Sequence, residues 1–542
     1  MVLNVFVKAG QEFLRLSTKS KIILLVCLSA LVFLIFSESE AQANKLKVLT
    51  WNVAAINNNP FEYWLTLKDY PKYDQLMNNV ESFVLDPPPK RDQTVDTLFT
   101  PEMFNRLMGK MAQAKFQDLQ IVKEMYEKDW RQRNIISGFL KDEMIGKKRL
   151  VSMPDRVTNT IKTSKGTFYR PTPINCYNGP RFTAIHDWFD SWLKFMFDTK
   201  VTEDGKVPVQ LLEKIPKAKY PAITEEEESV SIPLQTLIIA IFDGIQVRML
   251  NGLAGGAPEW QDLRERICSN LNTKKTDKTI GILKKSYSDA TIMFLQETAS
   301  SFIQAAKDNL GDRYHIIAPQ KLGGNDQNSL ILLNKRYFQL DSVKEVTQDA
   351  LSILKKSKSP VVDGDLLVIR VHDYWGKSYL LASFHGDTNG LATIPVVRAV
   401  KDVFESSLTS EDRFIFGMDA NTYEKVSSPE YQDVTEFAKF FVNEAKLTSC
   451  WGDTVSPKKH TTRNARTYMQ PQLSKAASKS EIETKGDANP KDFVLFEPKF
   501  YRVELVARDN TGNGAFIPGM VFPTLDFPSD HAIVRVVLTD NQ

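Results

Sequence analysis

The sequence predicts an α+β fold: a four-layer α/β-sandwich, in which helices flank two packed, mainly antiparallel β-sheets, with a large, mainly helical insertion. Three observations predict it. Short β-forming runs occur near residue 45 and again throughout the second half of the chain. Helical patterns lie between some of these runs and would cover the outer faces of the sheets. The long stretch between the first and second β-runs has helical patterns and few strand signals.

The first strand is predicted in KLKVLTWNV, from Lys45, because its residues alternate as they do on a strand with one buried face. Comparable runs recur later. They are TIMFLQE from Thr291, SLILLN from Ser329, DLLVIRVHDY from Asp365, SYLLASFH from Ser378, RFIFGMD from Arg413, DFVLFEPKF from Asp492 and HAIVRVVL from His531. Residues 301–310 and 394–406 have apolar positions near helical spacing, as expected for the flanking helices.

The chain of 542 residues is too long for a single hydrophobic core. We expect a targeting segment at 1–41, the first core strand at 45–59, a mainly helical insertion at 60–285 and the rest of the core at 286–542. With 42% hydrophobic and 25% charged residues, the composition is that of a globular protein. The net charge of +3 excludes a global field for polyanions, so an anion-binding surface would be local.

Lys8, Arg15, Lys19 and Lys21 precede an apolar run over residues 22–36 that contains no charged residue. This pattern is typical of a signal peptide cleaved after Ala41, or of an uncleaved transmembrane signal anchor, and the two interpretations stay open. Either predicts a protein of the secretory pathway, lumenal or membrane-anchored, with secretion as a further outcome. The absence of any Asn-x-Ser/Thr acceptor weighs against this location.

Cysteine usage limits the disulfide chemistry. Cys27 lies in the apolar run, so only Cys176, Cys268 and Cys450 remain beyond it. At most one bridge and one free thiol can form. No CxxC pair occurs, which argues against a structural zinc site.

Within the insertion, residues 100–142 and 182–198 show long helical patterns. Residues 234–250 predict a buried helix, interrupted at Asp243 and Gly244, and too short and polar to cross a membrane. Met153–Arg156 and Tyr169–Arg170 are weaker candidates for residues that gate a neighbouring site.

Polar residues able to hydrolyse a phosphodiester follow the predicted strands. Such a reaction needs a cation on the phosphate oxygens, a base for water and stabilisation of the leaving oxygen. Carboxylates and amides provide the hard oxygen ligands that suit magnesium. The candidates are Asn52 in TWNV, Glu297 in FLQE, His385 in SFHGD, Asp419 and Asn421 in GMDAN, Asp492 in KDFVLF, and Asp530 and His531 in PSDH.

In this order, each just beyond a β-run, these motifs resemble those of the endonuclease/exonuclease/phosphatase superfamily of deoxyribonuclease I. That family's motifs read strand-WN, strand-LQE, strand-H, GD-x-N, an aspartate before an apolar strand, and SDH. The resemblance covers residues 45–53 and then 286 onward, and it leaves the insertion unexplained. It implies a magnesium-dependent phosphoester hydrolase, with manganese as a substitute ion.

The resemblance also implies roles for individual residues. Glu297 is the expected principal metal ligand, with Asn52 beside it and Asp530 near a second or alternate metal position. Asp419 is expected to orient or deprotonate the attacking water, and Asn421 to donate to a phosphate oxygen.

Two histidines complete the implied set. His531 is expected to contact the scissile phosphate and assist water attack, with Asp492 as its orienting carboxylate. His385 is expected to donate to the phosphate or the leaving oxygen. The other four histidines match no motif, and we interpret them as structural.

Arg463 and Arg466 are candidates for substrate contact, because arginine forks suit phosphate. Both lie in the predicted long surface loop 456–490, and solvated loop charges are the alternative interpretation.

The sequence departs from the family pattern in three places. Ala54 stands where apurinic-site endonucleases carry a second acid. The GD-x-N motif has one added residue before Asp419, which a strand-end shift or bulge would absorb. About 245 residues separate Asn52 from Glu297, where family members have a few tens.

The core motifs leave several substrates open. Nucleic acid or a nucleotide is favoured by the breadth of the family and by Trp and Tyr residues that can stack bases. A phosphoinositide or sphingomyelin-type lipid is favoured by the N-terminal apolar run. A non-catalytic scaffold, with the insertion as its interaction module, is the alternative outside the enzyme class.

Overall fold

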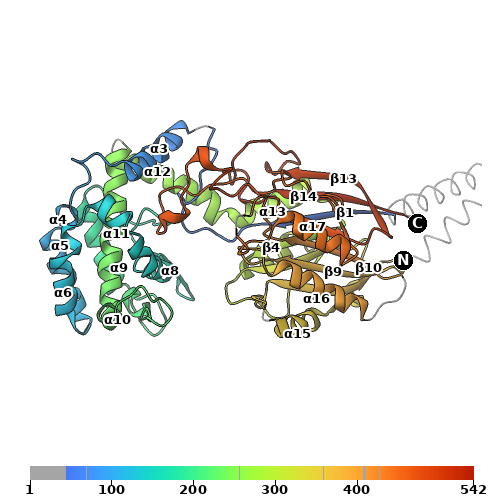
Figure 1. The fold of residues 1–542 in the computed structure, drawn as a ribbon, viewed down its shortest axis with the longest axis horizontal. Coiled ribbons are helices and arrows are strands. Elements are labelled where there is room, and N and C mark those ends of the chain that lie inside the picture. Colours follow the sequence, from blue (N-terminus) through green and yellow to red (C-terminus); the bar gives the residue numbers. More distant parts are fainter. Residues whose placement is uncertain are drawn as a thin grey trace, which may run out of the picture.

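The computed structural model describes residues 44–68, 70–254, 257–357, 359–406, 411–426 and 428–541. The predicted targeting segment therefore lies outside the described residues. A lobe built on β-sheets stands beside a helical lobe (Figure 1). The predicted four-layer sandwich with a helical insertion is confirmed.

Two six-stranded sheets form the core. In order, the first contains β13 (Tyr501–Asp509), β14 (Ile533–Asp540), β1 (Lys45–Asn52), β4 (Ile292–Thr298), β6 (Asn328–Asn334) and β5 (Tyr314–Ile317). The second contains β11 (Thr448–Ser449), β12 (Asp492–Phe496), β10 (Arg413–Asp419), β9 (Ser378–His385), β8 (Leu366–His372) and β7 (Lys344–Glu345). Neighbours are antiparallel except for β1 with β4 and β9 with β10.

Alternating side chains create the four layers. Phe294 and Val534 from the first sheet meet Ile415 and Val494 from the second in the layer between the sheets. On the outer face of the second sheet lie α15 (Thr347–Ser357), α16 (Thr393–Glu405) and α17 (Val434–Asn443). Over the first sheet lie α13 (Lys275–Ser286) and α14 (Ser300–Leu310).

Helix α13 differs from the expectation, because it lies within the range 60–285 assigned to the insertion. Ile280 and Leu283 of this helix share a hydrophobic cluster with Met293 and Leu295 of β4. The buried cluster of the insertion extends along the chain only as far as Ile267 on this side. The boundary therefore lies before α13.

The insertion is mainly helical. Its helices are α3 (Pro71–Leu85), α4 (Val95–Leu98), α5 (Pro101–Gln113), α6 (Leu119–Lys128), α7 (Glu143–Lys147), α8 (Ser152–Thr158), α9 (Ile185–Asp198), α10 (Glu225–Ser229), α11 (Ser231–Leu253) and α12 (Ala257–Cys268), with one hairpin, β2 (Thr160–Thr163) and β3 (Gly166–Tyr169). Short 3₁₀ or π segments occur in the insertion at Trp130–Gln132, Ile135–Leu140, Pro208–Leu211 and Ser269–Thr273. Outside the insertion, such segments occur at Leu340–Ser342, Leu473–Lys475 and Lys479–Glu481.

Helix α11 runs without a break through Asp243, so the predicted interruption is wrong. The Asp243 carboxylate is buried but accepts hydrogen bonds from Arg170 Nε at 2.7 Å and Trp192 Nε1 at 2.9 Å. These bonds offset the cost of burying the charge. Arg170 is fully buried, so it secures α11 and does not gate a site. Among the described residues, α11 alone is long and apolar enough to cross a membrane, but 78% of its apolar window is buried inside the protein.

The segment 456–490 is more than the surface loop that the sequence predicts. Its Met469, Ala477 and Ile482 are buried in the hydrophobic cluster of the insertion. Trp64 Nε1 donates to the carbonyl of Ala477 at 2.9 Å. This segment therefore joins the sandwich to the helical lobe.

The insertion contains a disulfide between Cys176 and Cys268, which are 92 positions apart. Cys450 is free and buried. The chain thus has the one bridge and one free thiol that the sequence allows as a maximum beyond residue 43.

Candidate active site

Strand pairing brings three polar residues together at one end of the second sheet. Asp419 is the register partner of His385 on β9 and of Asp492 on β12. Register partners project from the same face of a sheet, so the three side chains are neighbours. The pairing of β10 shows no register shift, so the bulge expected for the longer GMDAN motif is absent from this described strand.

The first sheet contributes Asn52, at the end of β1, and Glu297, near the end of the parallel neighbour β4. Asn52 Nδ2 donates to Glu297 Oε1 and to Asp419 Oδ2, at 2.9 Å in each case. Glu297 has a φ of 55°, where the pairing of β4 with β6 shifts. Its Oε2 accepts a bond from the backbone of Ala55 at 2.8 Å. One amide thus connects acids of both sheets.

His385 lies between these two acids. Its Nε2 is 3.1 Å from Glu297 Oε1 and 3.7 Å from Asp419 Oδ2. Burial lowers the pKa of His385, but the two carboxylates outweigh burial and raise it to about 9. Burial would raise the pKa of Glu297, yet His385, Asn52 and Ala55 lower it well below its usual range. Glu297 is therefore ionised at neutral pH.

His531 and Asp492 form a buried pair. Nδ1 of the imidazole is 3.0 Å from Asp492 Oδ2, and Nε2 is 3.6 Å from Asp419 Oδ2. Burial raises the pKa of Asp492, although His531 opposes this. Burial would lower the pKa of His531, but Asp492 and Asp419 outweigh it and raise the pKa well above its usual range. Asp492 thus orients the ring so that Nε2 faces Asp419.

Hydrogen bonds hold the PSDH turn against β1. Ser529 Oγ donates to the carbonyl of Asn52 at 2.6 Å and accepts from the His531 backbone at 3.0 Å. Trp51 Nε1 donates to the carbonyl of His531 at 3.0 Å. Asp530 lines the same pocket but is outside the compact groups of potential metal ligands in the described chain.

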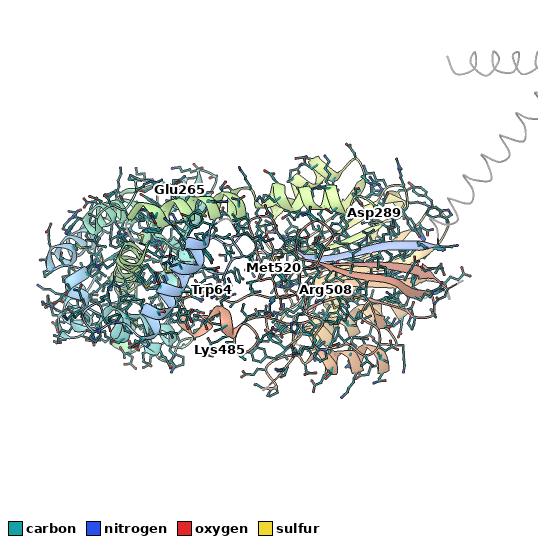
Figure 2. The ribbon with its side chains drawn as sticks, turned by 90° about the horizontal axis from the view of Figure 1, so that it is seen from above. Trp64, Glu265, Asp289, Lys485, Arg508 and Met520 are labelled. Atoms are coloured by element: carbon teal, nitrogen blue, oxygen red, sulfur yellow. A yellow bond between two sulfur atoms is a disulfide. The ribbon has the colours of Figure 1, made fainter. Side chains whose placement is uncertain are left out.

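Glu297, His385, Asp419, Asp530 and His531 line a pocket of about 940 Å³ between the two lobes. Its wall includes residues after β1, apolar side chains such as Leu65 and Leu271, the Cys176–Cys268 bridge and part of segment 456–490. Figure 2 shows the labelled Trp64 and Lys485 where the lobes meet, with Glu265 in the helical lobe and Asp289 in the sandwich. The insertion therefore forms part of the candidate site.

Of the three remaining predicted residues, Asn421 and Arg466 line the pocket and Arg463 does not. Asn421 lines the pocket, where its Nδ2 donates to the carbonyl of Gly386 at 3.1 Å. Arg466 also lines the pocket and pairs with Glu62 at 2.7 Å. Arg463 is not among the lining residues. It pairs with Glu483 and donates to the carbonyl of Gly519.

Among the pocket residues that sequence reasoning missed are Lys275 and Lys491. Lys491 Nζ donates to Asn421 Oδ1 at 3.1 Å and to Asp487 Oδ2 at 2.9 Å. Its position next to Asp492 is the one signal that could have found it. Lys275 lies in the insertion range and belongs to no motif.

The donor set fits a hard divalent cation. Glu297, His385 and Asp419 place potential ligand atoms within 4.8 Å of one another. Two of the three are carboxylates, which Mg²⁺ prefers. Asn52 directs its Nδ2 toward both acids, while its Oδ1 accepts from the backbone of Ala54 at 2.8 Å. Glu297 and Asp419 would hold the ion in this arrangement.

The sandwich is similar in fold to solved proteins of the endonuclease/exonuclease/phosphatase superfamily. One is the endonuclease/exonuclease/phosphatase from Bacteroides vulgatus, with 14% identity over 50% of this chain and 94% of that one and a TM-score of 0.34. Another is the human Nocturnin catalytic domain with bound sulfate, with 11% identity, 50% and 89% coverage and a TM-score of 0.34. A third is D. rerio TDP2 complexed with single-strand DNA product, with 12% identity, 50% and 93% coverage and a TM-score of 0.32.

Residues 92–265, all in the insertion, match a protein family described as a domain of unknown function, DUF8234. A comparison with curated proteins found no match.

Proposed function

We propose that the protein is a magnesium-dependent phosphoester hydrolase, acting as a phosphodiesterase or nuclease. The observation that carries this proposal is a cluster of six polar residues from six separate strands or turns. Glu297, His385, Asp419 and His531 line one pocket. Asn52 and Asp492 lie buried behind them and contact them directly. Buried acids and imidazoles at this density are costly for stability and are typical of active sites.

The geometry supports a division of labour. Asp492 fixes His531 through Nδ1, so that Nε2–H and the Asp419 carboxylate face the same space. Together they can orient a water molecule, whose proton the Asp419 carboxylate can accept. The water oxygen forms the new bond to phosphorus as the bond to the leaving oxygen breaks. His385, whose Nε2 also faces Asp419 Oδ2, can donate a proton to that leaving oxygen. A bound divalent ion would neutralise phosphate charge.

Hydrolysis of bis-p-nitrophenyl phosphate in the presence of magnesium tests the reaction class. We expect p-nitrophenol release by the wild type and its loss in Glu297→Gln, because that change removes a negatively charged oxygen donor. Magnesium should also raise the thermal midpoint of the wild type and not of the variant. Glu504→Gln, on the exposed part of β13, serves as a control. Absence of metal-dependent release by the wild type would favour the scaffold interpretation.

Nucleic acid or a nucleotide is the proposed substrate. Tyr431 lines the pocket with 38% of its surface exposed and packs edge-on against Tyr423, with ring centroids 4.9 Å apart. An exposed aromatic face beside a phosphate site is suited to stacking a base. We expect single-stranded DNA or RNA, or a dinucleotide, to be cleaved faster than phosphoinositide or sphingomyelin vesicles, and faster by the wild type than by Tyr431→Ala.

A lipid phosphodiester is the second candidate, because Leu65, Ile267 and Leu271 give part of the pocket an apolar wall. Preferential cleavage of the vesicles would select it.

The secretory location is a proposal too, supported by the Cys176–Cys268 bridge, since disulfides persist in oxidising compartments. If the protein enters the secretory pathway, we expect a C-terminal tag to be protected from protease in sealed microsomes. Addition of detergent should remove this protection.

A further inference from the structure

Lys275 is buried in the pocket wall, where the insertion ends and α13 begins. Only 6% of its surface is exposed. Lysine is almost never buried to this extent unless its charge is paired. The side chain therefore calls for an explanation beyond packing.

The ammonium group is short of partners. Its Nζ donates to the carbonyl of Ala55 at 3.0 Å, and the described residues offer it no carboxylate within ion-pair distance. An ammonium has three protons, so one bond leaves two without a protein acceptor. Burial lowers the pKa of Lys275 to about 8, although Asp530 and Glu297 act to raise it. The protein alone does not compensate this charge.

Lys491, in the same pocket and equally buried, provides an internal comparison. It bonds to Asn421 and Asp487, and its pKa is raised because Asp487 outweighs burial. The pocket can therefore satisfy a buried lysine from its own side chains. At Lys275 the pocket supplies only one acceptor, the Ala55 carbonyl. Lys275 also lines a cavity large enough for a ligand, which could accept from the two remaining N–H groups.

The backbone of Ala55 relates Lys275 to the catalytic centre. The Ala55 carbonyl accepts from Lys275, and the Ala55 amide donates to Glu297 Oε2 at 2.8 Å. A single residue thus separates the ammonium from the principal proposed metal ligand.

We propose that Lys275 forms an anion subsite of the pocket and binds a negatively charged phosphoryl oxygen of the substrate. This inference rests on the proposed function, because it assigns the ligand as a phosphoester. It also gives the insertion junction a direct part in substrate binding. A phosphoryl oxygen accepts charge-assisted hydrogen bonds and supplies the missing partner.

Binding of inorganic phosphate to the full-length protein, measured by calorimetry with magnesium present, tests the subsite. We expect Lys275→Met, which keeps the apolar stem, to weaken binding by about tenfold or more, because a charge-assisted bond is lost. Lys278→Met is the matched control. Lys278 lies one turn later on α13 and bonds to Asn270 and Leu525 outside the pocket lining, so the control should bind phosphate like the wild type.

A second measurement needs no variant. Acetic anhydride labelling, read by mass spectrometry, should modify Lys275 more slowly when phosphate is present, with Lys278 unaffected. Equal phosphate affinity in a folded Lys275→Met, equal labelling, or no phosphate binding by the wild type would each overturn the subsite. Phosphate binding through Lys275 without any hydrolysis would instead preserve the subsite and overturn the proposed function.

Discussion

Asp419 occupies the centre of the site, because its Oδ2 faces Asn52 Nδ2 and the imidazoles of His385 and His531. Its Oδ1 accepts from the backbone of Asn421 at 2.9 Å. Each buried charge is thus compensated by another, and removal of one member leaves its partners uncompensated. Catalytic and structural effects of substitutions here will be coupled.

Asp492→Asn tests the orienting role at this scale. The amide keeps the shape but removes the charge that fixes Nδ1 of His531, so we expect kcat to fall by about 10²- to 10⁴-fold. Steady-state hydrolysis of bis-p-nitrophenyl phosphate measures the change, and Glu504→Gln should stay within about twofold of the wild type, as expected for an exposed ion pair. A kcat unchanged in the folded variant would remove Asp492 from the mechanism.

Lys275 predicts a pH dependence of stability. Its pKa is lowered by burial to about 8, so between about pH 8 and pH 10.5 the unfolded chain holds more protons than the folded one. The contribution of Lys275 to the unfolding free energy therefore rises with pH across this window and is constant below it. We expect the thermal midpoint of Lys275→Met, relative to the wild type, to fall as the pH rises from about 7.5 to about 10. A constant difference would contradict the buried, charged state.

Residues at strand ends could be predicted from sequence because their motifs place them at the carboxyl ends of parallel neighbours. Asn52, Glu297, His385 and Asp419 all occupy such positions. Lys275 could not be predicted, since its place in the pocket depends on how the insertion packs. Arg463 and Arg466 had equal standing in the sequence, and only the fold shows which one lines the pocket.

Among the elements, β10 shows how packing fixes a residue type. A Cβ added at Gly417 would lie 2.3 Å from Cδ2 of Phe294, whose ring comes from the opposite sheet. The strand can therefore approach the first sheet closely only because residue 417 has no side chain. This closeness also brings Asp419 within reach of Asn52.

We expect Gly417→Ala to destabilise the protein by about 1–3 kcal/mol through overpacking. Denaturant unfolding measures the effect. Gly109→Ala is the matched control: a Cβ added at this position on α5 meets no described atom within 4 Å, so the change should stabilise the helix slightly. Equal midpoints for Gly417→Ala and the wild type would contradict the close packing.

The Cys176–Cys268 bridge is the second element with a measurable effect. It closes a loop of 92 positions, and its removal should cost about 2–5 kcal/mol of stability. We expect a reducing agent to lower the thermal midpoint of the wild type and to leave a Cys176→Ser/Cys268→Ser variant unchanged. A midpoint insensitive to reduction would show that the bridge does not stabilise the insertion.

Regular, buried strands were predictable, whereas β5, β7, β11 and β13 were not. The first three are short, and β13 is a partly exposed edge strand with no continuous apolar run. Asp243 suggested a break in α11 because its partners Arg170 and Trp192 are distant in sequence. A local sequence pattern therefore cannot predict whether a helix continues through a charged residue when distant hydrogen-bond partners stabilise that residue.

At the scale of the whole molecule, segment 456–490 belongs to the sandwich by sequence and to the helical lobe by packing. The segment also lines the pocket, with Arg466 among its contributions. The two lobes therefore share both a hydrophobic cluster and a candidate active site. This sharing could not be predicted, since the apolar residues of the segment are few and scattered.

Met469→Ala tests this coupling. Met469 is fully buried in the shared cluster, so truncation should cost about 2–5 kcal/mol. We expect one calorimetric transition, shifted to lower temperature, together with weaker substrate affinity, because the segment that carries Arg466 loosens. Two separate transitions in the wild type would show that the lobes unfold independently.

The bond between Trp51 and His531 spans 480 positions of the chain. Strand β1 has β14 as one of its two neighbours, and β14 follows His531. During translation at about 5–20 residues per second, β1 must wait roughly half a minute to a minute and a half for that neighbour. Until β14 has been synthesised, one edge of β1 has no partner strand, and such an open edge invites aggregation unless a chaperone covers it. The candidate active site can therefore be completed only late in synthesis, because His531 is among the last residues to be made.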